Sequence, residues 1–568
     1  MKKYCKLITV AIISASLNLS CNESEFLKEV PLDFLSPENA FVTNADFQSA
    51  LTDIYVKVRD LYSISGDGGN EYNFYGTDIA YNARRDANSR VGDYNNRIIP
   101  EGYLPRVVWQ GWYKVISNAN TIISRLPDTK LTSEEQNEIR AEAMLFRAWA
   151  YRDLVHLYGG VPLIIEETAS PRADYVRASR EQVLNQIIMD ATEAATYLGE
   201  ISSVKDGKLS KPVAWHLLAE TYIVLGEYDK AIAAADNAID KSGLSLMRNR
   251  FGSLRNEPGD VYSDLFKVNN QNRAQGNTES IWVIQYELDV PGGVITSAGV
   301  NFNMLERQLG PCVYTVTAPD GKPGIINATS TSTLQSGGRG VGLGRTTDYF
   351  LYDIWGLNPN DDNRIVTNPD IRTSAFNIVR DFIYNDPSSD YFGKSIIDFP
   401  SENNIGENDW RWYPFPSKGT TPGQHPSALI VDPTHLTLRS TAGATFRDMY
   451  LIRLAETYLL RAEAYLMKGD KANAAKDINE VRNRANAFPV NASEVDLDYI
   501  LDERARELTF EESRRITLSR MNVLVERVRK YNPLNKDNIN DYNNLFPIPF
   551  VEIETNKDAV LEQNPGYN

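Results

Sequence analysis

Aromatic side chains in polar, loop-like segments are the residues of this sequence best suited to bind a ligand. The 568 residues include 30 Tyr and 8 Trp, and the segments Tyr75–Asp78 and Tyr81–Arg85 combine rings with Asp and Arg. Flat sugar faces stack on indole and phenol rings, while sugar hydroxyls need polar partners. A single ring is better explained by packing within its own loop, so the set carries the prediction. The predicted ligand-binding residues are Tyr75, Asp78, Tyr81, Arg85, Tyr314, Trp355, Trp410 and Trp412.

Motifs that carry out catalysis are scarce in the sequence. The nucleophile motif Gly-x-Ser-x-Gly and the phosphate-binding motif Gly-x-x-x-x-Gly-Lys do not occur. The four histidines, His156, His216, His425 and His435, lack the His-Glu-x-x-His spacing of zinc sites. The 75 Asp and Glu residues leave room for a carboxylate pair at the spacing of a glycoside hydrolase, which is one alternative. We predict a binding protein that is not an enzyme, because nothing singles out one acid in an apolar site.

Two polar loops resemble cofactor sites only in part. The glycine-rich segment Gly337–Gly344 is followed by a polar run and not by a phosphate-binding helix, so we interpret it as a flexible loop that can border the ligand. The segment Asn358–Asn363 has oxygen ligands at calcium-like spacing, but it lacks the EF-hand glycine and terminal glutamate. The sequence therefore predicts no cofactor, and a structural calcium ion is the weakly supported alternative.

The charge of the chain excludes one class of partner. With 59 Lys and Arg against 75 Asp and Glu, the formal net charge is −16. Binding to the phosphate backbone of nucleic acids needs a basic face. Nucleic acid is therefore not a predicted partner.

The N-terminus is typical of a secreted lipoprotein. Three lysines within the first six residues precede an apolar run, Leu7–Leu19, that is too short to span a bilayer. Cys21 follows this run, although Asn18 stands where a lipobox usually has Leu. We predict cleavage after residue 20 and lipid attachment at Cys21, with an ordinary secretory signal as the alternative. Only Cys312 then remains as a thiol, so no disulfide framework is expected.

Helical repeats organise most of the chain. In Pro212–Asp240, small and aromatic residues follow the spacing of a tetratricopeptide repeat, and Gly226 supplies the turn between two antiparallel helices. A second copy lies in Tyr458–Val481, and a third joins the helix around Tyr151 to one at Arg180–Leu198. Three such units suffice to stack into a continuous core. Two more amphipathic helices are predicted at 45–61 and 109–126.

A long segment between the repeats has a different character. In Ser245–Thr445 Gly, Asn, Pro and aromatic residues dominate, and short apolar pieces such as Ile281–Ile284 resemble strands. The predicted fold is therefore mostly α, a tetratricopeptide-like helical-repeat scaffold with a large, irregular, loop-rich insertion that contains short strands. Its predicted parts are a signal peptide at 1–20, an N-terminal helical part at 21–245, the ligand-binding insertion at 246–445 and a C-terminal helical part at 446–568.

Four places in the sequence resemble the SusD and RagB family of outer-membrane lipoproteins from Bacteroidota. In one of them the family usually has Gly and Asp where this chain has Glu512 and Thr517. Nearly all motif residues are expected to hold the fold, with Arg and Glu pairs as salt bridges between helices. The matching stretches are Arg140–Tyr151 with Tyr158–Leu163, Tyr450–Tyr465, Glu503–Leu508 with Glu511, and Phe546–Pro549 with Gln563–Tyr567.

The resemblance implies a surface-exposed lipoprotein of the outer membrane that lies as a lid on a SusC-type TonB-dependent transporter. Such proteins capture oligosaccharides, or peptides in the RagB branch, and deliver them for import. Contact with the membrane then runs through the lipid on Cys21. We therefore expect a glycan-binding protein of nutrient uptake and polysaccharide utilisation, with peptide binding as the alternative.

Overall fold

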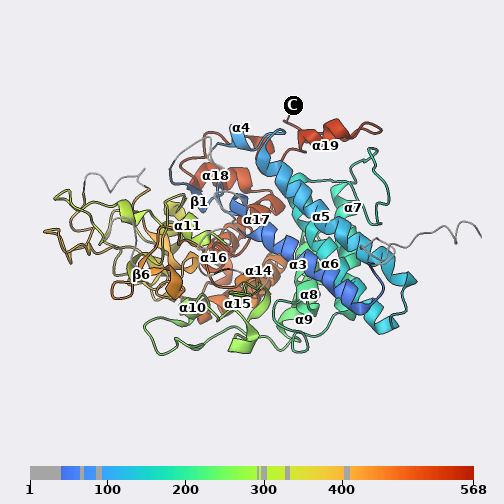
Figure 1. The fold of residues 1–568 in the computed structure, drawn as a ribbon. Coiled ribbons are helices and arrows are strands. Elements are labelled where there is room, and N and C mark those ends of the chain that lie inside the picture. Colours follow the sequence, from blue (N-terminus) through green and yellow to red (C-terminus); the bar gives the residue numbers. More distant parts are fainter. Residues whose placement is uncertain are drawn as a thin grey trace, which may run out of the picture.

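Long helices from both ends of the chain form the larger part of the molecule (Figure 1). The structure is a computed structural model that describes residues 40–63, 70–84, 93–290, 293, 295, 303–326, 333–401 and 410–567. The first helices are α3 (Asn44–Tyr62), α4 (Tyr94–Arg97), α5 (Tyr103–Arg125), α6 (Ser133–Tyr158), α7 (Arg180–Tyr197), α8 (Lys211–Val224) and α9 (Tyr228–Ile239). The last are α14 (Leu454–Met467), α15 (Lys471–Arg484), α16 (Leu497–Leu508), α17 (Arg514–Arg520), α18 (Leu524–Tyr531) and α19 (Phe550–Thr555).

The helices stack in an order that closes one scaffold from two distant parts of the chain. α3 packs on α5, and each helix from α5 to α9 packs on the next. The chain leaves the stack after α9, and it returns as α14, which packs on α9 and on α15. In Figure 1 these helices lie together on the right and centre, and the intervening segment extends to the left. The prediction of a mostly helical, tetratricopeptide-like scaffold is confirmed.

Local sequence signals begin and end these helices. The side chain of Thr132 accepts a hydrogen bond from the backbone of Glu135, whose carboxylate bonds back to the backbone of Thr132, and this capping box starts α6. Gly226 and Gly469 have φ angles of 75° and 88°, a left-handed conformation that glycine adopts at little cost. The two tight turns let α9 fold back on α8 and α15 on α14.

Short strands and turns make up the segment between α9 and α14, which we call the lobe. Its helices are α10 (Val261–Asp264), α11 (Leu305–Leu309), α12 (Thr333–Ser336) and α13 (Asp348–Leu351). The described strands of the molecule form four antiparallel pairs, and all of these strands except β1 lie in the lobe. They are β1 (Ala80–Asn82) with β3 (Gly344–Thr346), β2 (Ser280–Ile284) with β8 (Met449–Arg453), β4 (Ile378–Val379) with β5 (Phe415–Pro416), and β6 (Ile430–Asp432) with β7 (Thr437–Leu438).

Two of these strands join the lobe to the helices. Trp282 of β2 lies opposite Ile452 of β8 and is 2% exposed. Its ring centroid lies 5.1 Å from that of Trp149 in α6. The apolar strand predicted at Ile281–Ile284 therefore belongs to the core of the scaffold. The lobe also has a smaller core of its own, in which Phe382 and Trp412 are buried.

A buried network of charges also connects the lobe to the scaffold. Glu507 of α16 accepts hydrogen bonds from Arg453 of β8 at 2.9 Å and from Arg372 of the lobe at 3.1 Å, and it also pairs with Arg484 of α15. All four side chains are fully buried. Burial alone would raise the pKa of Glu507, but the arginines and Lys418 outweigh it and lower that pKa to about 2. The carboxylate therefore stays charged inside the protein.

The two departures from the family pattern in the sequence contact each other. The hydroxyl of Thr517 donates a hydrogen bond to the carboxylate of Glu512 at 3.0 Å. The same carboxylate accepts a hydrogen bond from Arg504 of α16 at 2.7 Å. A carboxylate at position 512 and a hydroxyl at position 517 thus form one bonded unit at the start of α17. The side chains at these two positions are therefore hydrogen-bonded.

None of the helices in the described ranges is long and apolar enough to cross a membrane. The signal peptide and Cys21 lie outside these ranges, as does Arg85.

Candidate functional site

Tyr314 and Trp410 are the predicted ligand residues that the structure leaves partly exposed. Tyr314 lies in a 3-10 turn, Val313–Thr315, and Trp410 lies 96 positions later in the chain. The backbone N–H of Cys312 donates to the carbonyl of Trp410 at 3.1 Å, so the segments that carry the two rings lie side by side. Both belong to the edge of the lobe core.

Each of these rings faces an arginine. The guanidinium carbon of Arg339 lies 4.1 Å from the ring centroid of Tyr314, and that of Arg84 lies 4.4 Å from the ring centroid of Trp410. Both distances suit cation–π attraction. Arg84 also donates a hydrogen bond to the carbonyl of Val341 at 2.7 Å. We call Arg84, Tyr314, Arg339 and Trp410 the lobe surface.

The glycine-rich segment Gly337–Gly344 holds the lobe surface together. A Cβ atom on Gly340 would lie 2.2 Å from the backbone of Gly310, so only glycine allows this approach next to α11. The backbone N–H of Val341 donates to the carbonyl of Arg307 at 3.0 Å. The segment predicted as a loop near the ligand therefore carries Arg339 and bonds Arg84.

A buried His–Glu pair anchors this segment from beneath. The carboxylate of Glu306, in α11, lies 2.8 Å from Nε2 of His425 and accepts a hydrogen bond from Thr421 at 2.8 Å. The same carboxylate accepts the backbone N–H of Arg339 at 3.0 Å. Both side chains of the pair are fully buried, so the pair does not face solvent. Its hydrogen bond to the backbone of Arg339 holds that residue in place.

The other predicted ligand residues that the structure describes are buried. Asp78 is 0% exposed and pairs with Arg514 and Arg527, each at 2.7 Å. Tyr75 donates to the side-chain carbonyl of Gln308 at 3.1 Å. Trp355 donates to the carbonyl of Phe350 at 2.7 Å. Tyr75, Tyr81, Trp355 and Trp412 are 1%, 4%, 6% and 4% exposed. In this conformation their side chains offer almost no surface, so their direct contact with a ligand stays a prediction.

Sequence reasoning missed Arg84 and Arg339 as site residues. Arg84 precedes the predicted Arg85, and Arg339 is the arginine within the glycine-rich segment. The available signal for Arg339 was its place between Gly338 and Gly340 in a segment already expected near the ligand. The ring partners of Arg84 and Arg339 lie 326 and 25 positions away, so spacing in the sequence does not reveal the pairs.

In the segment Asn358–Asn363, the weakly supported calcium alternative, side-chain oxygen atoms accept hydrogen bonds from neighbouring residues of the chain. Arg364 donates to the carboxylate of Asp362 at 2.9 Å, and the side-chain oxygen of Asn358 accepts the backbone N–H of Asn360 at 3.0 Å. In the ranges that the structure describes, no group of three or more His, Cys, Asp or Glu side chains is placed to hold a metal ion.

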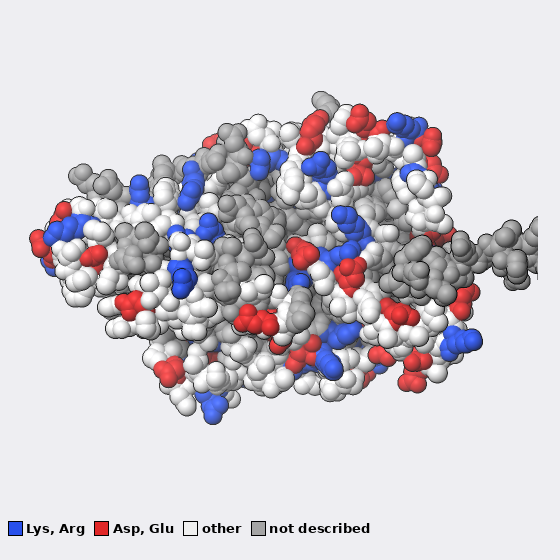
Figure 2. Space-filling view, in the orientation of Figure 1, with Lys and Arg blue, Asp and Glu red and all other residues white. Residues whose placement is uncertain are grey.

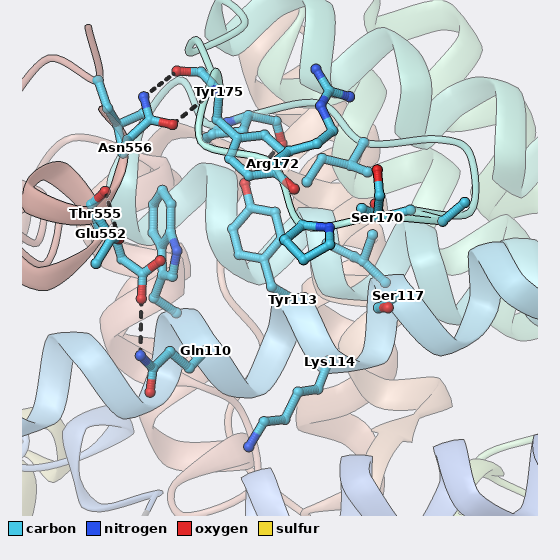
Figure 3. Close-up of a pocket in the computed structure, with 18 residues that line it drawn as sticks. Gln110, Tyr113, Lys114, Ser117, Ser170, Arg172, Tyr175, Glu552, Thr555 and Asn556 are labelled. Carbon is cyan, nitrogen blue, oxygen red and sulfur yellow. Dashed lines mark hydrogen bonds between the residues drawn. The ribbon is translucent and has the colours of Figure 1, made fainter. Parts of the chain in front are cut away.

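A hollow lies on the helical scaffold, where sequence reasoning predicted no site. It is a cavity of about 880 Å³ between α5, the segment 162–175 and α19 (Figure 3). Trp109, Tyr113 and Tyr175 contribute aromatic rings, and Pro162 and Pro171 contribute apolar surface. The segments that meet here are almost 450 positions apart, which explains why no sequence pattern indicated it.

Most polar groups of this cavity bond to the protein itself. Tyr113 donates to the carbonyl of Pro162 at 2.8 Å, and Gln110 donates to Glu552 at 2.9 Å. Asn556 bonds both the N–H and the carbonyl of Tyr175 at 2.8 Å (Figure 3). These bonds hold the walls together, and Lys114, Ser117 and Ser170 add further polar groups to the lining (Figure 3). We prefer the lobe surface as the candidate because it combines partly exposed rings with cations.

Family comparisons agree with this architecture. The SusD family model matches residues 278–567, and a model described as starch-binding associating with outer membrane matches residues 32–223. The first match spans more than half of the chain. The chain therefore belongs to the SusD family, as the sequence motifs predicted.

Individual relatives match along the whole chain or along part of it. SusD-like protein P25 of Formosa agariphila is 26% identical and is aligned over 98% of this chain and 99% of its own length. Starch-binding protein SusD of Bacteroides thetaiotaomicron is 37% identical over 126 residues, which are 21% of this chain and 22% of that protein. A solved laminarin-binding SusD-like protein has a TM-score of 0.66 at 22% identity, with coverage of 93% and 100%. The last likeness shows the shared fold.

Proposed function

We propose that this chain is a surface-exposed, lipid-anchored protein of the outer membrane that binds a glycan and delivers it to a SusC-type TonB-dependent transporter. Membership of the SusD family supports this proposal, as do relatives that are named for starch binding and laminarin binding. The observation that carries it is the lobe surface, where the partly exposed rings of Tyr314 and Trp410 lie beside Arg339 and Arg84. Rings supply stacking surface, and guanidinium groups supply hydrogen-bond donors.

The proposed role is binding without hydrolysis. Hydrolysis of a glycosidic bond needs an accessible acid with a raised pKa. Burial raises the pKa of Asp153 to about 6, but this residue is 0% exposed within α6. Burial also raises the pKa of Glu456, which lines a cavity of about 10 Å³, room for about one water molecule. A sugar cannot reach either acid. Burial also raises the pKa of Asp60 and of Asp353, which are exposed, so the proposal of binding without hydrolysis rests on the family and is tested by the fate of the ligand.

Calorimetry with a panel of ligands tests the proposed binding. The panel contains starch, laminarin and acidic polysaccharides, together with peptides of matched length. We expect saturable binding of at least one glycan, and unchanged ligand when the mixture is analysed chromatographically after prolonged incubation. Binding of peptides alone would replace the glycan proposal by a peptide-carrier role. Release of shorter sugars would show that the chain is an enzyme.

Extraction of the native chain from membranes tests the anchor and the partner together. Because Cys21 follows a basic and apolar leader, we expect the wild-type chain to partition into detergent and the variant Cys21→Ala to lose this partitioning. In mild detergent the tagged wild-type chain should co-purify with a barrel transporter at near equal amounts. Equal partitioning of the two chains would contradict the lipid anchor, and recovery without any transporter would contradict the delivery step.

A further inference from the structure

Ten buried arginines, from the scaffold and from the lobe, are paired with carboxylates. Arg147 pairs with Asp190 at 2.7 Å, and Arg520 pairs with Glu463 at 2.6 Å. The same holds for Arg152, Arg372, Arg453, Arg461, Arg484, Arg504, Arg514 and Arg527, each of which contacts at least one Asp or Glu. A chain with 75 acidic residues has carboxylates available for this purpose. Buried arginines need them, because an unpaired charge away from water is costly.

The two arginines of the lobe surface differ from these ten. In the part of the chain that the structure describes, neither Arg84 nor Arg339 forms a salt bridge, and their partners are aromatic rings and a backbone carbonyl. Buried Arg380, Arg447 and Arg515 also form no salt bridge in this part of the chain, but backbone carbonyls accept hydrogen bonds from them. Arg84 is exposed, whereas Arg339 is 7% exposed and its Nε has no hydrogen-bond partner among these residues. The two cations thus lie on adjoining segments, each beside an aromatic ring.

Arg339 is held near a second cation. Burial lowers the pKa of Arg339, and nearby Arg307 lowers it further, although Tyr314 opposes both. Arg84 donates a hydrogen bond to the carbonyl of Val341, two residues beyond Arg339, so a further cation lies on the adjoining segment. Figure 2 shows Lys and Arg side chains on the lobe end of the molecule, together with Asp and Glu side chains. An anion at this place would relieve the repulsion between these cations.

We propose that the lobe surface selects an acidic glycan, whose sugar faces stack on Tyr314 and Trp410 while its carboxylate or sulfate group binds exposed Arg84, with the charge of buried Arg339 adding to the attraction. This inference rests on the proposed function and names the ligand class of that site. A guanidinium group binds carboxylate or sulfate through two parallel hydrogen bonds, which a neutral hydroxyl cannot match. The rings hold both guanidinium groups in place before the ligand arrives, so little ordering is needed on binding.

Matched pairs of polysaccharides test the choice of ligand. Polygalacturonate is compared with its methyl ester, and dextran sulfate with dextran, because each pair shares a backbone and differs in charge. We expect the acidic member of at least one pair to bind about tenfold or more tightly than the neutral member, and the difference to shrink as salt screens the charges. The pair that shows the difference identifies carboxylate or sulfate as the bound group.

Exposed Arg84 provides the variant, and Arg106 provides its matched control. Arg106 is also exposed, and its guanidinium carbon lies 6.0 Å from the ring of Tyr103 on α5, in the scaffold and not in the lobe. We expect Arg84→Gln to weaken binding of the acidic polysaccharide about tenfold or more, and Arg106→Gln to leave it unchanged. A thermal melt of each variant verifies the fold.

The remaining outcomes separate this inference from the proposed function. If neutral and acidic members bind equally, the acidic ligand class is wrong but the glycan-binding role stands. If no polysaccharide of the wider panel binds, the proposed function itself fails. Equal losses in Arg84→Gln and Arg106→Gln would show general attraction of charges and overturn the site. Tighter binding of polyglutamate than of both acidic polysaccharides would assign the surface to acidic peptides instead.

Discussion

Replacing Glu507 by Gln is expected to destabilise the chain by about 3–5 kcal/mol at neutral pH, the usual cost of removing one partner from a buried charge network. The change leaves Arg453, Arg372 and Arg484 without the carboxylate that they share. For a chain of this length the loss corresponds to roughly 3–5 °C in the midpoint of thermal unfolding, which calorimetry measures. Because these arginines come from the lobe, β8 and α15, the lobe and scaffold should loosen together.

The same residue predicts the pH dependence of stability. The pKa of Glu507 is about 2 in the folded chain against 4.5 as its ordinary value. A carboxylate with a depressed folded pKa stabilises the protein above the unfolded pKa, and this contribution is lost as pH falls through the folded value. The unfolding midpoint of the wild type should therefore decrease between about pH 5 and pH 2, and Glu507→Gln should show a shallower decrease.

An exposed glutamate provides the control for both measurements. Glu554 lies at the exposed end of α19, so Glu554→Gln removes the same charge without opening a buried network. It should melt as the wild type does, since exposed charges contribute little. A Glu507→Gln variant that also melts like the wild type would contradict the assignment of the network as the junction between lobe and scaffold.

The scaffold was predictable because its signals are local. Turn glycines such as Gly226 and caps such as Thr132 act within a few residues, and the small residues of the repeat recur at short intervals. Predicted helices at 45–61 and 109–126 correspond to α3 and to most of α5. The apolar run that predicted the strand at Ile281–Ile284 is an equally local signal. Such features need no knowledge of distant partners.

The candidate site was predictable only in part, because its residues depend on distant partners. Asp78 has the polar neighbours of a ligand residue, but its ion-pair partners Arg514 and Arg527 lie 436 and 449 positions away. Nothing near Asp78 in the sequence shows that they neutralise it. Tyr314 and Trp410 remain partly exposed in similarly polar segments. Composition predicted aromatic residues for the site, and long-range packing decided which of them reach solvent.

The family motifs illustrate the same distinction for structure and function. Glu512 and Thr517 depart from the family pattern, yet their side chains bond each other and Arg504. Two changes that each look disruptive in the sequence therefore form one satisfied group. The motif stretches hold the scaffold, whereas the lobe surface is built from segments outside them. Family membership thus supports the proposed role of the chain, and the proposed choice of ligand rests on the lobe surface.

Trp410→Ala is expected to weaken glycan binding by about 1–3 kcal/mol, or roughly 5–150-fold, as loss of a ring contact at a binding centre does. The substitution removes the stacking face, and it also removes the ring that lies 4.4 Å from the guanidinium of Arg84. Folding should change little, because Trp410 is partly exposed at the edge of the lobe core and the main core lies among the helices. Calorimetry gives the affinity, and a thermal melt of the variant verifies the fold.

Tyr175→Ala is the matched control, because it removes a partly exposed ring from the cavity on the helical scaffold. Tyr175 lines the cavity beside α5, where the guanidinium carbon of Arg172 lies 5.3 Å from its ring centroid. If the lobe surface binds the glycan, Tyr175→Ala binds as the wild type does and Trp410→Ala does not. The reverse result would place the glycan in the scaffold cavity. Both variants can also be titrated with the acidic polysaccharide. Loss of Trp410 frees the side chain of Arg84 from its ring. We therefore expect Trp410→Ala to reduce the preference for the acidic ligand as well as the affinity.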